Sequence, residues 1–351
     1  MNVGVLTFHR CINYGSYWQA RCLVEGLKAM GHDAELLDHD SVQVRSAEWR
    51  CAFNPQLPVR TRRDDLARYG AKARRFLTAF DRLPQSRRFS LDHPEEAGEY
   101  DAVVVGSDEV WNFRHPWYGH KPIFFGDRLR ARRLISYAAS FGNHDAAQGI
   151  DPVWAARLDR FDWLSVRDEN SREIVRHSVG VKPELVLDPC LQFPPPRIMS
   201  LGEERPYVAV YGHSFPAWLA YRVRAWAQAT GRRVVSIGYR NDWADEQRIE
   251  SGPEAFSALI AGADAVATNF FHGCVFALHH QRPFVCAPSP YRFNKVRDLL
   301  RSLSAERHLV GSEVPPPTYD ALLGDPLDPA IGDRIAAMRI ISGAYLGAAL
   351  A

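Results

Sequence analysis

The sequence has no apolar run long enough to cross a lipid bilayer, and its first ten residues, MNVGVLTFHR, lack the basic segment and long apolar stretch of a signal peptide. It also lacks a dominant charge, because 43 basic and 41 acidic side chains give a formal net charge of +2. Such a chain has no overall field that would attract nucleic acid or anionic lipid. We therefore expect a soluble, cytoplasmic protein with no integral membrane segment and no nucleic-acid partner.

Patterns typical of metal binding are absent as well. The six cysteines show neither CxxC spacing nor pairing with histidines at zinc-finger intervals, so we expect reduced thiols. His279 and His280 are adjacent, and adjacent helical residues point about 100° apart, with no carboxylate or cysteine spaced to join them. The sequence predicts no metal site.

Short β-rich runs alternate with helical patterns along the chain, which predicts parallel sheets covered by helices. The proline-rich stretch QFPPPRIMS, ending at Ser200, has the composition of a stiff linker between two series of such runs. We expect strands at residues 3–8, 33–38, 101–107, 133–140 and 163–168, and in the second series at residues 207–213, 233–239, 263–269 and 283–289.

A chain of 351 residues with 46% hydrophobic residues can form two cores. We predict an α/β fold with two Rossmann-like open parallel-sheet domains, residues 1–192 and 200–325, facing each other across a cleft. The last stretch, residues 326–351, is expected to form a C-terminal helix that packs back on the first domain.

A basic stretch, RTRRDDLARYGAKARRF, runs from Arg60 to Phe76. We interpret it as an amphipathic helix with a solvated basic face; the alternative is a patch for nucleic acid or an acidic polymer.

Ligands of open parallel sheets bind at the carboxyl ends of the strands, and most distinctive stretches of this sequence fall there. Asn13, Tyr14, Gly15 and Ser16 follow the first strand, and their N–H groups could face an anion; the alternative is an ordinary capped turn. Neither GxGxxG nor a P-loop is present, which argues against a dinucleotide or Walker-type triphosphate site.

Two further strand ends carry candidate ligand contacts. GSDEVWN places Ser107, Asp108 and Trp111 after one strand, where a carboxylate and an aromatic ring could orient a hydroxylated acceptor. YAASFGN ends another strand with Ser140 and Gly142, small residues that allow a close backbone approach.

Arg167 and His272 each have two interpretations. Arg167 ends an apolar strand, where its partner is either an anionic ligand or a nearby carboxylate such as Asp168. His272 interrupts the apolar run TNFFHGCVF and is either a core histidine bonded to the backbone or an acid/base group at a helix start.

Taken in order, NYG, GSDEVWN, YAASFGN, SVRDENS, LDPCL, TNFFHGCVFA and a final helix RIISGAYL resemble the polysaccharide pyruvyl transferase family over nearly the whole chain. The resemblance implies a fold like that of the two-Rossmann (GT-B) glycosyltransferases, with the acceptor on the first domain and the donor on the second. It also implies phosphoenolpyruvate as co-substrate, no separate cofactor, and a pyruvyl ketal formed on hydroxyls of a sugar or glycan precursor with release of phosphate. A lipid-linked acceptor would bring the enzyme to the membrane surface peripherally.

The resemblance assigns roles to the residues at the strand ends. His272 and Asp108 are the expected catalytic residues, and Trp111, Trp117 and Tyr118 could stack on a sugar ring. Donor binding is expected from Arg167, Arg240, Arg292, Lys295, Asn269 and Gly273, and acceptor contacts or turn positions from Asn13, Tyr14, Gly15, Ser107, Trp111, Ser140 and Gly142.

One departure affects the donor site. Better-characterised members carry an arginine two positions before the histidine, where this chain has Phe270. Arg240, Arg292, Lys295 and His213 are candidates to replace it. Two other functions stay open: a nucleotide-sugar-dependent glycosyltransferase of the same fold, and a catalytically lapsed member that binds a glycan.

Overall fold

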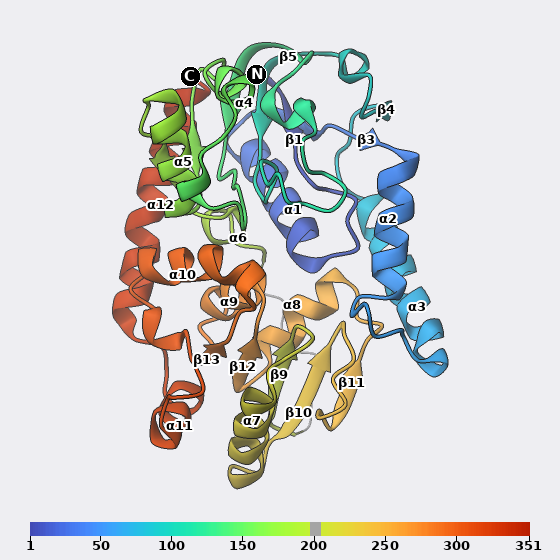
Figure 1. Cartoon of the computed structure of the whole chain (residues 1–351), viewed down its shortest axis with the longest axis vertical. Helices are drawn as coiled ribbons and strands as arrows, with labels where there is room; N and C mark the ends of the chain where they lie inside the picture. The colour runs from blue at the N-terminus through green and yellow to red at the C-terminus, as the bar shows by residue number, and fades with distance from the viewer. Residues whose placement is uncertain (197–204) are drawn as a thin grey trace. The chain divides into compact units, whose positions relative to one another are not determined.

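The computed structural model describes residues 1–196 and 205–351 (Figure 1). These residues form two compact units, here called unit 1 (residues 1–48, 82–195 and 334–351) and unit 2 (residues 49–81 and 196–333). The linker expected at residues 193–200 lies in part outside the described residues.

Unit 1 is built on a four-stranded parallel sheet. Its strands, in the spatial order β2-β1-β5-β6, are β2 (Asp33–Leu36), β1 (Asn2–Leu6), β5 (Glu99–Val105) and β6 (Arg130–Ser136). The central strands β1 and β5 are apolar runs buried on both faces, as a parallel sheet covered by helices requires. Two short strand pairs lie outside this sheet: β3 (His39–Asp40) with β4 (Phe89–Ser90), and β7 (Ser165–Val166) with β8 (Glu184–Leu185).

The α-helices of unit 1 include α1 (Tyr14–Ala29), α4 (Pro152–Leu158), α5 (Glu169–Val179) and α6 (Pro189–Gln192). The last helix, α12 (Pro329–Ala349), belongs to unit 1 from residue 334 onward. Ser342 Oγ accepts a hydrogen bond from Leu187 N at 2.9 Å, Arg339 Nε donates to Leu191 O at 2.7 Å, and Tyr345 donates to Ser136 O at 2.8 Å. The helix is thus bonded to the segment that contains LDPCL and to the end of β6.

Unit 2 is built on a five-stranded parallel sheet (Figure 1). In the spatial order β11-β10-β9-β12-β13, its strands are β11 (Glu246–Arg248), β10 (Arg233–Ile237), β9 (Tyr207–Tyr211), β12 (Ala265–Thr268) and β13 (Phe284–Cys286). Its helices are α2 (Val42–Phe53, shared with unit 1), α3 (Arg63–Phe80), α7 (Ala217–Ala229), α8 (Pro253–Ala261), α9 (Phe271–His279), the 3-10 helix η4 (Pro290–Arg292), α10 (Phe293–Ser302) and α11 (Pro316–Gly324).

The prediction of two Rossmann-like parallel-sheet units is confirmed, and all nine predicted strands are present within a few residues of the expected positions. The sequence missed β3, β4, β8 and β11, which have only two or three residues each and no apolar run. None of the helices among the described residues is both long enough and apolar enough to span a bilayer.

The first domain boundary, residues 1–192, is wrong for residues 49–81, because this stretch belongs to unit 2. Three contacts of α3 within unit 2 explain the difference. Arg68 pairs with Glu250 at 2.8 Å, Lys72 Nζ donates to Gly238 O at 3.0 Å, and Asp65 pairs with Arg240 at 3.1 Å. The helix is amphipathic as expected, but its buried stripe includes one basic residue, Lys72.

Gly273 lets helix α9 begin directly against strand β12. A Cβ atom at this position would lie 2.0 Å from Thr268 Oγ1, which itself donates a 2.6 Å hydrogen bond to Tyr211 O. An added methyl group would displace Thr268 and break this hydrogen bond. We therefore expect Gly273→Ala to destabilise the protein by about 1–3 kcal/mol, despite the higher helix propensity of alanine. Thermal unfolding of this variant should show a clearly lower midpoint. Gly347→Ala in α12, where an added Cβ meets nothing within 4 Å, is the control and should leave the midpoint unchanged or raised; equal midpoints for both variants would contradict this packing argument.

Candidate functional site

Asp108 and Arg167 meet at the carboxyl edge of the unit 1 sheet. Asp108 follows β5 and has a positive φ of 73°, a backbone conformation rare for residues other than glycine. Its carboxylate accepts hydrogen bonds from Ser16 Oγ at 2.8 Å and from Arg167 Nη2 at 3.1 Å. Both oxygens of this expected catalytic residue are therefore engaged by side chains of unit 1.

Arg167 does not present a free charge to a ligand. Its side chain is 1% exposed and forms a second ion pair with Asp188 Oδ2 at 2.9 Å. Asp188 is thus a second carboxylate partner of Arg167. The suggested Asp168 caps helix α5 by accepting from Ser171 N at 2.8 Å, and its charge also helps to raise the pKa of the guanidinium. Arg167 joins the ends of β5 and β7 to the start of α6, and the carboxylate interpretation of this arginine describes the structure.

The turn after β1 is a capped helix start. Asn13 Oδ1 accepts hydrogen bonds from Gly15 N at 2.8 Å and Ser16 N at 3.3 Å, and the Tyr14 side chain is buried. Because the Asn13 side chain takes up these N–H groups, the alternative of an ordinary capped turn describes the structure better than an anion-facing turn.

Ser107, Ser140 and Gly142 hold neighbouring loops together at the same edge. Ser107 Oγ accepts from Asp108 N at 2.6 Å, Ser140 N donates to Asp108 O at 3.0 Å, and Ser140 Oγ accepts from Gly142 N at 2.9 Å. Gly142 has a φ of 59°, and a Cβ there would lie 2.4 Å from Glu109 Oε2. These small residues permit the close approach that the sequence predicted, but their neighbours are protein loops.

The aromatic residues proposed to stack on a sugar are mostly in the core of unit 1. Trp111 is 1% exposed, and its indole N–H donates to Phe124 O at 2.8 Å. Tyr118 is buried and stacked on Phe8 at 4.2 Å between ring centroids. The stacking hypothesis is therefore wrong for these two rings, while the half-buried Trp117 donates its indole N–H to Glu48 at 2.7 Å.

Glu48 and His115 were missed by the sequence analysis. Burial raises the pKa of Glu48, and the nearby Asp108 carboxylate adds to this effect, against hydrogen bonds from Cys11 and Trp117. Burial lowers the pKa of His115 to about 4, although Asp108 opposes this shift. Glu48 lies on a helix without a strand-end motif, whereas His115 comes three residues after GSDEVWN, a proximity that could have marked it.

In unit 2, His272 lies in the first turn of α9, at the carboxyl end of β12. Its side chain belongs to the buried set, and Phe270 at the helix N-cap provides no side-chain cap. The N-terminal end of a helix carries a partial positive charge, which favours an anion near this turn.

Asn269 and Gly273, two expected donor contacts, have structural roles in unit 2. Asn269 Nδ2 donates to His213 O at 2.7 Å and so holds the loop after β9. Gly273 provides the close packing of α9 on Thr268 described above.

The candidate cations of unit 2 differ in their partners. Arg240 is paired with Asp65 at 3.1 Å and with Asp242 at 2.5 Å, so its charge is balanced. Lys295 is buried, with its ammonium 6.0 Å from the Tyr291 ring centroid. Within residues 1–196 and 205–351, no carboxylate forms an ion pair with Arg292, and burial lowers the pKa of its guanidinium.

Arg292 lies against the residue that replaces the family arginine. Its guanidinium carbon is 4.2 Å from the ring centroid of Phe270, and its Nη1 donates to Ser289 Oγ at 3.1 Å. A guanidinium over an aromatic face is stabilised without losing its charge. Arg292, which belongs to η4 and not to the segment that follows β12, thus provides a cation next to Phe270.

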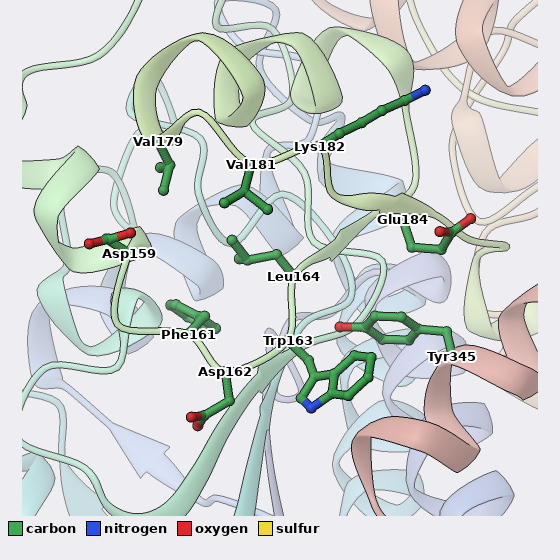
Figure 2. A pocket seen from close by; sticks show the side chains of 10 residues that line it. All are labelled: Asp159, Phe161, Asp162, Trp163, Leu164, Val179, Val181, Lys182, Glu184 and Tyr345. Atoms are coloured by element: carbon green, nitrogen blue, oxygen red, sulfur yellow. The ribbon is translucent and has the colours of Figure 1, made fainter.

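Two pockets lie at opposite edges of their sheets. A pocket of about 320 Å³ in unit 1 is lined by Trp163, Leu164, Val181, Glu184 and Tyr345 (Figure 2). Trp163 and Leu164 precede β7, Val181 precedes β8, Glu184 begins β8 and Tyr345 comes from α12, so the pocket lies at the amino ends of these two strands, where ligands of open sheets do not usually bind.

The second pocket, of about 240 Å³, lies in unit 2 at the carboxyl edge, beside the loops that follow β9 and β10. Its lining includes Tyr69, Phe215, Arg240 and Trp243. This pocket, and not the larger one in unit 1, is at the edge where the fold places ligands.

Replacement of Arg167 tests whether it is structural. Arg167→Met leaves Asp108 and Asp188 buried without their counter-charge, so we expect a loss of about 3–5 kcal/mol in the free energy of unfolding. Chemical denaturation monitored by tryptophan fluorescence measures this loss. Arg172→Met, which removes a partly exposed pair with Glu169, is the control and should cost at most about 1 kcal/mol. A stable Arg167→Met variant would show that the two ion pairs do not hold this edge together.

Comparisons with solved structures agree with the architecture. The chain is similar to S. aureus MnaA in a co-structure with UDP (12% identity, covering 96% of this chain and 91% of that chain, TM-score 0.55). It is also similar to a putative UDP-N-acetylglucosamine 2-epimerase from Listeria monocytogenes (10% identity, 96% and 90%, TM-score 0.52) and, less closely in structure, to the glycosyltransferase of kitacinnamycin (13% identity, 99% and 97%, TM-score 0.47). At these identities the similarity concerns the fold alone, and the two structures with TM-scores above 0.5 agree with the expected GT-B-like fold.

No curated protein sequence shows significant similarity to the chain. The pattern of the polysaccharide pyruvyl transferase family, in contrast, matches residues 13–288 and so includes every strand-end motif described above except the final helix. This chain belongs to the polysaccharide pyruvyl transferase family.

Proposed function

We propose that the protein transfers the pyruvyl group of phosphoenolpyruvate to hydroxyls of a sugar or glycan precursor, with the donor held at the carboxyl edge of the unit 2 sheet. Arg292 carries this proposal. It is a cation with no ion pair among the described residues, and it lies against Phe270, two residues before His272.

Phosphoenolpyruvate carries a phosphate and a carboxylate, so its site needs fixed cations or N–H donors. Arg292 provides a planar guanidinium, and the N-terminal turn of α9 provides a partial positive charge with no side-chain cap. Arg240 is a poorer candidate because Asp65 and Asp242 already balance its charge.

The reaction requires proton transfers as well as charge. A proton adds to the methylene carbon, a sugar hydroxyl attacks the carbon that bears the phosphate, and that hydroxyl loses its proton. A second hydroxyl of the same sugar then attacks this carbon, the bond from carbon to the phosphate oxygen breaks, and hydrogen phosphate leaves. The product is a pyruvyl ketal, and no oxidant or reductant takes part.

His272 is the proposed proton carrier. Imidazole titrates near neutral pH and can both donate and accept a proton during one turnover. His272 lies in the first turn of α9, and Phe270, whose ring supports Arg292, is the N-cap of the same helix. The start of α9 therefore fixes the positions of both residues.

The free thiols fit a reducing compartment, so we place this reaction in the cytoplasm. We also propose that the reaction needs no metal ion.

A nucleotide-sugar donor is the second candidate. The 240 Å³ pocket beside β9 and β10 contains the rings of Tyr69, Phe215 and Trp243, on which a base could stack. One of the structural neighbours contains UDP, although the similarity to it is one of fold.

Calorimetric titration of the whole protein with phosphoenolpyruvate, UDP-sugars and ADP-sugars separates these candidates. We expect phosphoenolpyruvate to bind and Arg292→Met to weaken it by about 10-fold or more, the loss expected for a charge-assisted contact. Arg301→Met, an exposed arginine on α10, is the matched control and should bind as the wild type does. Binding of a nucleotide sugar without phosphoenolpyruvate would replace the proposed donor.

His272→Ala tests the proton carrier. We expect phosphoenolpyruvate binding within a few-fold of wild type and a drop in turnover of about 10²–10⁴-fold, as for removal of a general acid/base. Phosphate release in the presence of a panel of sugar acceptors measures turnover, and the exposed His177→Ala is the control. Full activity of His272→Ala would rule out this role, and no phosphate release by the wild type with any acceptor would favour the glycan-binding alternative.

A further inference from the structure

Lys72 is a buried lysine at the carboxyl edge of the unit 2 sheet. It comes from α3, in the stretch of residues 49–81 that leaves unit 1 and joins unit 2. The residue is 3% exposed, its Nζ donates to Gly238 O at 3.0 Å, and it lies 4.3 Å from the ring centroid of Tyr239. A lysine in the buried stripe of a helix is expensive to desolvate, so its position calls for a reason.

Three aromatic rings connect Lys72 to Arg292. The ring centroids of His213, Tyr239 and Phe270 are 5.2–5.5 Å apart in each pairing. Lys72 lies on Tyr239, and Arg292 lies on Phe270 at 4.2 Å. The rings follow β9, β10 and β12, so the two cations flank the ends of three adjacent strands.

The charges of Lys72 and Arg292 act on the same place. The pKa of His213 is lowered to about 4, mainly by burial and in part by repulsion from Arg292 and Lys72. Two acidic side chains at this face form ion pairs with other residues: Asp65 with Arg240, and Glu250 with Arg68. The half-buried His213 between the two cations leaves this place open to solvent in part.

We propose that Lys72 and Arg292 together bind the phosphate of the donor, with His213, Tyr239 and Phe270 as the floor of the site. This inference rests on the proposed function for the identity of the donor, but the anion site itself depends only on the geometry of unit 2. A tetrahedral dianion placed over these rings would be held by an ammonium from one side and a guanidinium from the other. The stretch of residues 49–81 thereby contributes a binding residue, Lys72, to unit 2 as well as packing.

Proton uptake should accompany anion binding at this site. Burial lowers the pKa of Lys72 from its usual value to about 7, opposed by the nearby Cys51. The lysine is therefore charged below pH 7 and increasingly neutral above it, and an anion favours the charged form. Affinity should be greatest at pH 6 and should fall by up to tenfold per unit above pH 7, as expected for one coupled proton.

Other groups that face Lys72 behave differently over this range. The pKa of His213, about 4, keeps that ring neutral from pH 6 to 8.5, and the raised pKa of Tyr69, about 12, keeps its hydroxyl protonated. An arginine keeps its positive charge throughout this range, so Lys72→Arg separates the titration of Lys72 from that of any other group.

Sulfate is the probe for the experiment because it stays a dianion throughout pH 6 to 8.5. Calorimetric titration with sulfate and with phosphoenolpyruvate would compare wild type, Lys72→Met, Lys72→Arg, Arg292→Met and the control Arg74→Met, an exposed arginine two residues along α3. We expect wild type and Arg74→Met to bind sulfate at least tenfold more tightly at pH 6 than at pH 8.5. Lys72→Met and Arg292→Met should lose at least tenfold in affinity at pH 6, and Lys72→Arg should bind at both pH values.

Each contrary result has a distinct meaning. Normal sulfate and phosphoenolpyruvate binding by both methionine variants would overturn the site, whatever the reaction. A pH dependence that persists in Lys72→Arg would overturn the coupling to Lys72. Sulfate binding lost in the variants, in a protein that does not use phosphoenolpyruvate, would leave the anion site standing and end the proposed function. Thermal unfolding of each variant checks its fold, and if Lys72→Met is unfolded, Lys72→Arg and Arg292→Met carry the test.

Discussion

Unit 1 depends on the burial of Arg167 between Asp108 and Asp188. A guanidinium with 1% of its side chain exposed is tolerable only because two carboxylates lie within 3.1 Å of it. These ion pairs join the loop after β5, the end of β7 and the start of α6, while Ser16 brings the start of α1 to the same carboxylate. The motifs GSDEVWN, SVRDENS and LDPCL therefore each contribute one residue to a single charged cross-link.

In unit 2, the buried cations at the carboxyl edge of the sheet have aromatic rings as neighbours, where Arg167 of unit 1 has carboxylates. The Arg292 guanidinium lies on the ring of Phe270 and donates to the hydroxyl of Ser289, and it has no ion pair among the described residues. Lys72 is held by a carbonyl oxygen and a ring. An aromatic face supports a cation but does not neutralise it, so the positive potential of Arg292 remains available to an incoming anion. The contrast between a balanced arginine in unit 1 and an unbalanced one in unit 2 is the physical reason for assigning the anionic donor to unit 2.

The sequence predicted the parts of the molecule that depend on local patterns. Apolar runs followed by glycine or small polar residues placed all nine main strands, and the carboxyl-edge rule directed attention to Asp108, Arg167 and His272. It could not say which charges are balanced, because Asp188 and Asp108 reach Arg167 from positions 21 and 59 residues away. It also missed Lys72, although the spacing of Tyr69, Lys72, Ala73 and Phe76 places this lysine on the apolar face of α3, a signal that a count of basic residues conceals.

The replacement of an arginine by Phe270 is best understood as a relocation of charge. A phenylalanine at the helix N-cap cannot bind an anion, yet its ring provides a surface on which Arg292 of η4 lies at 4.2 Å. A guanidinium delivered from a neighbouring element has a different direction from one delivered by position 270, so the donor would be held at a different angle to His272. Under the proposed function, the site would keep the sign of its charge and change its geometry, and this change is where a difference in donor or acceptor from other members of the family would originate.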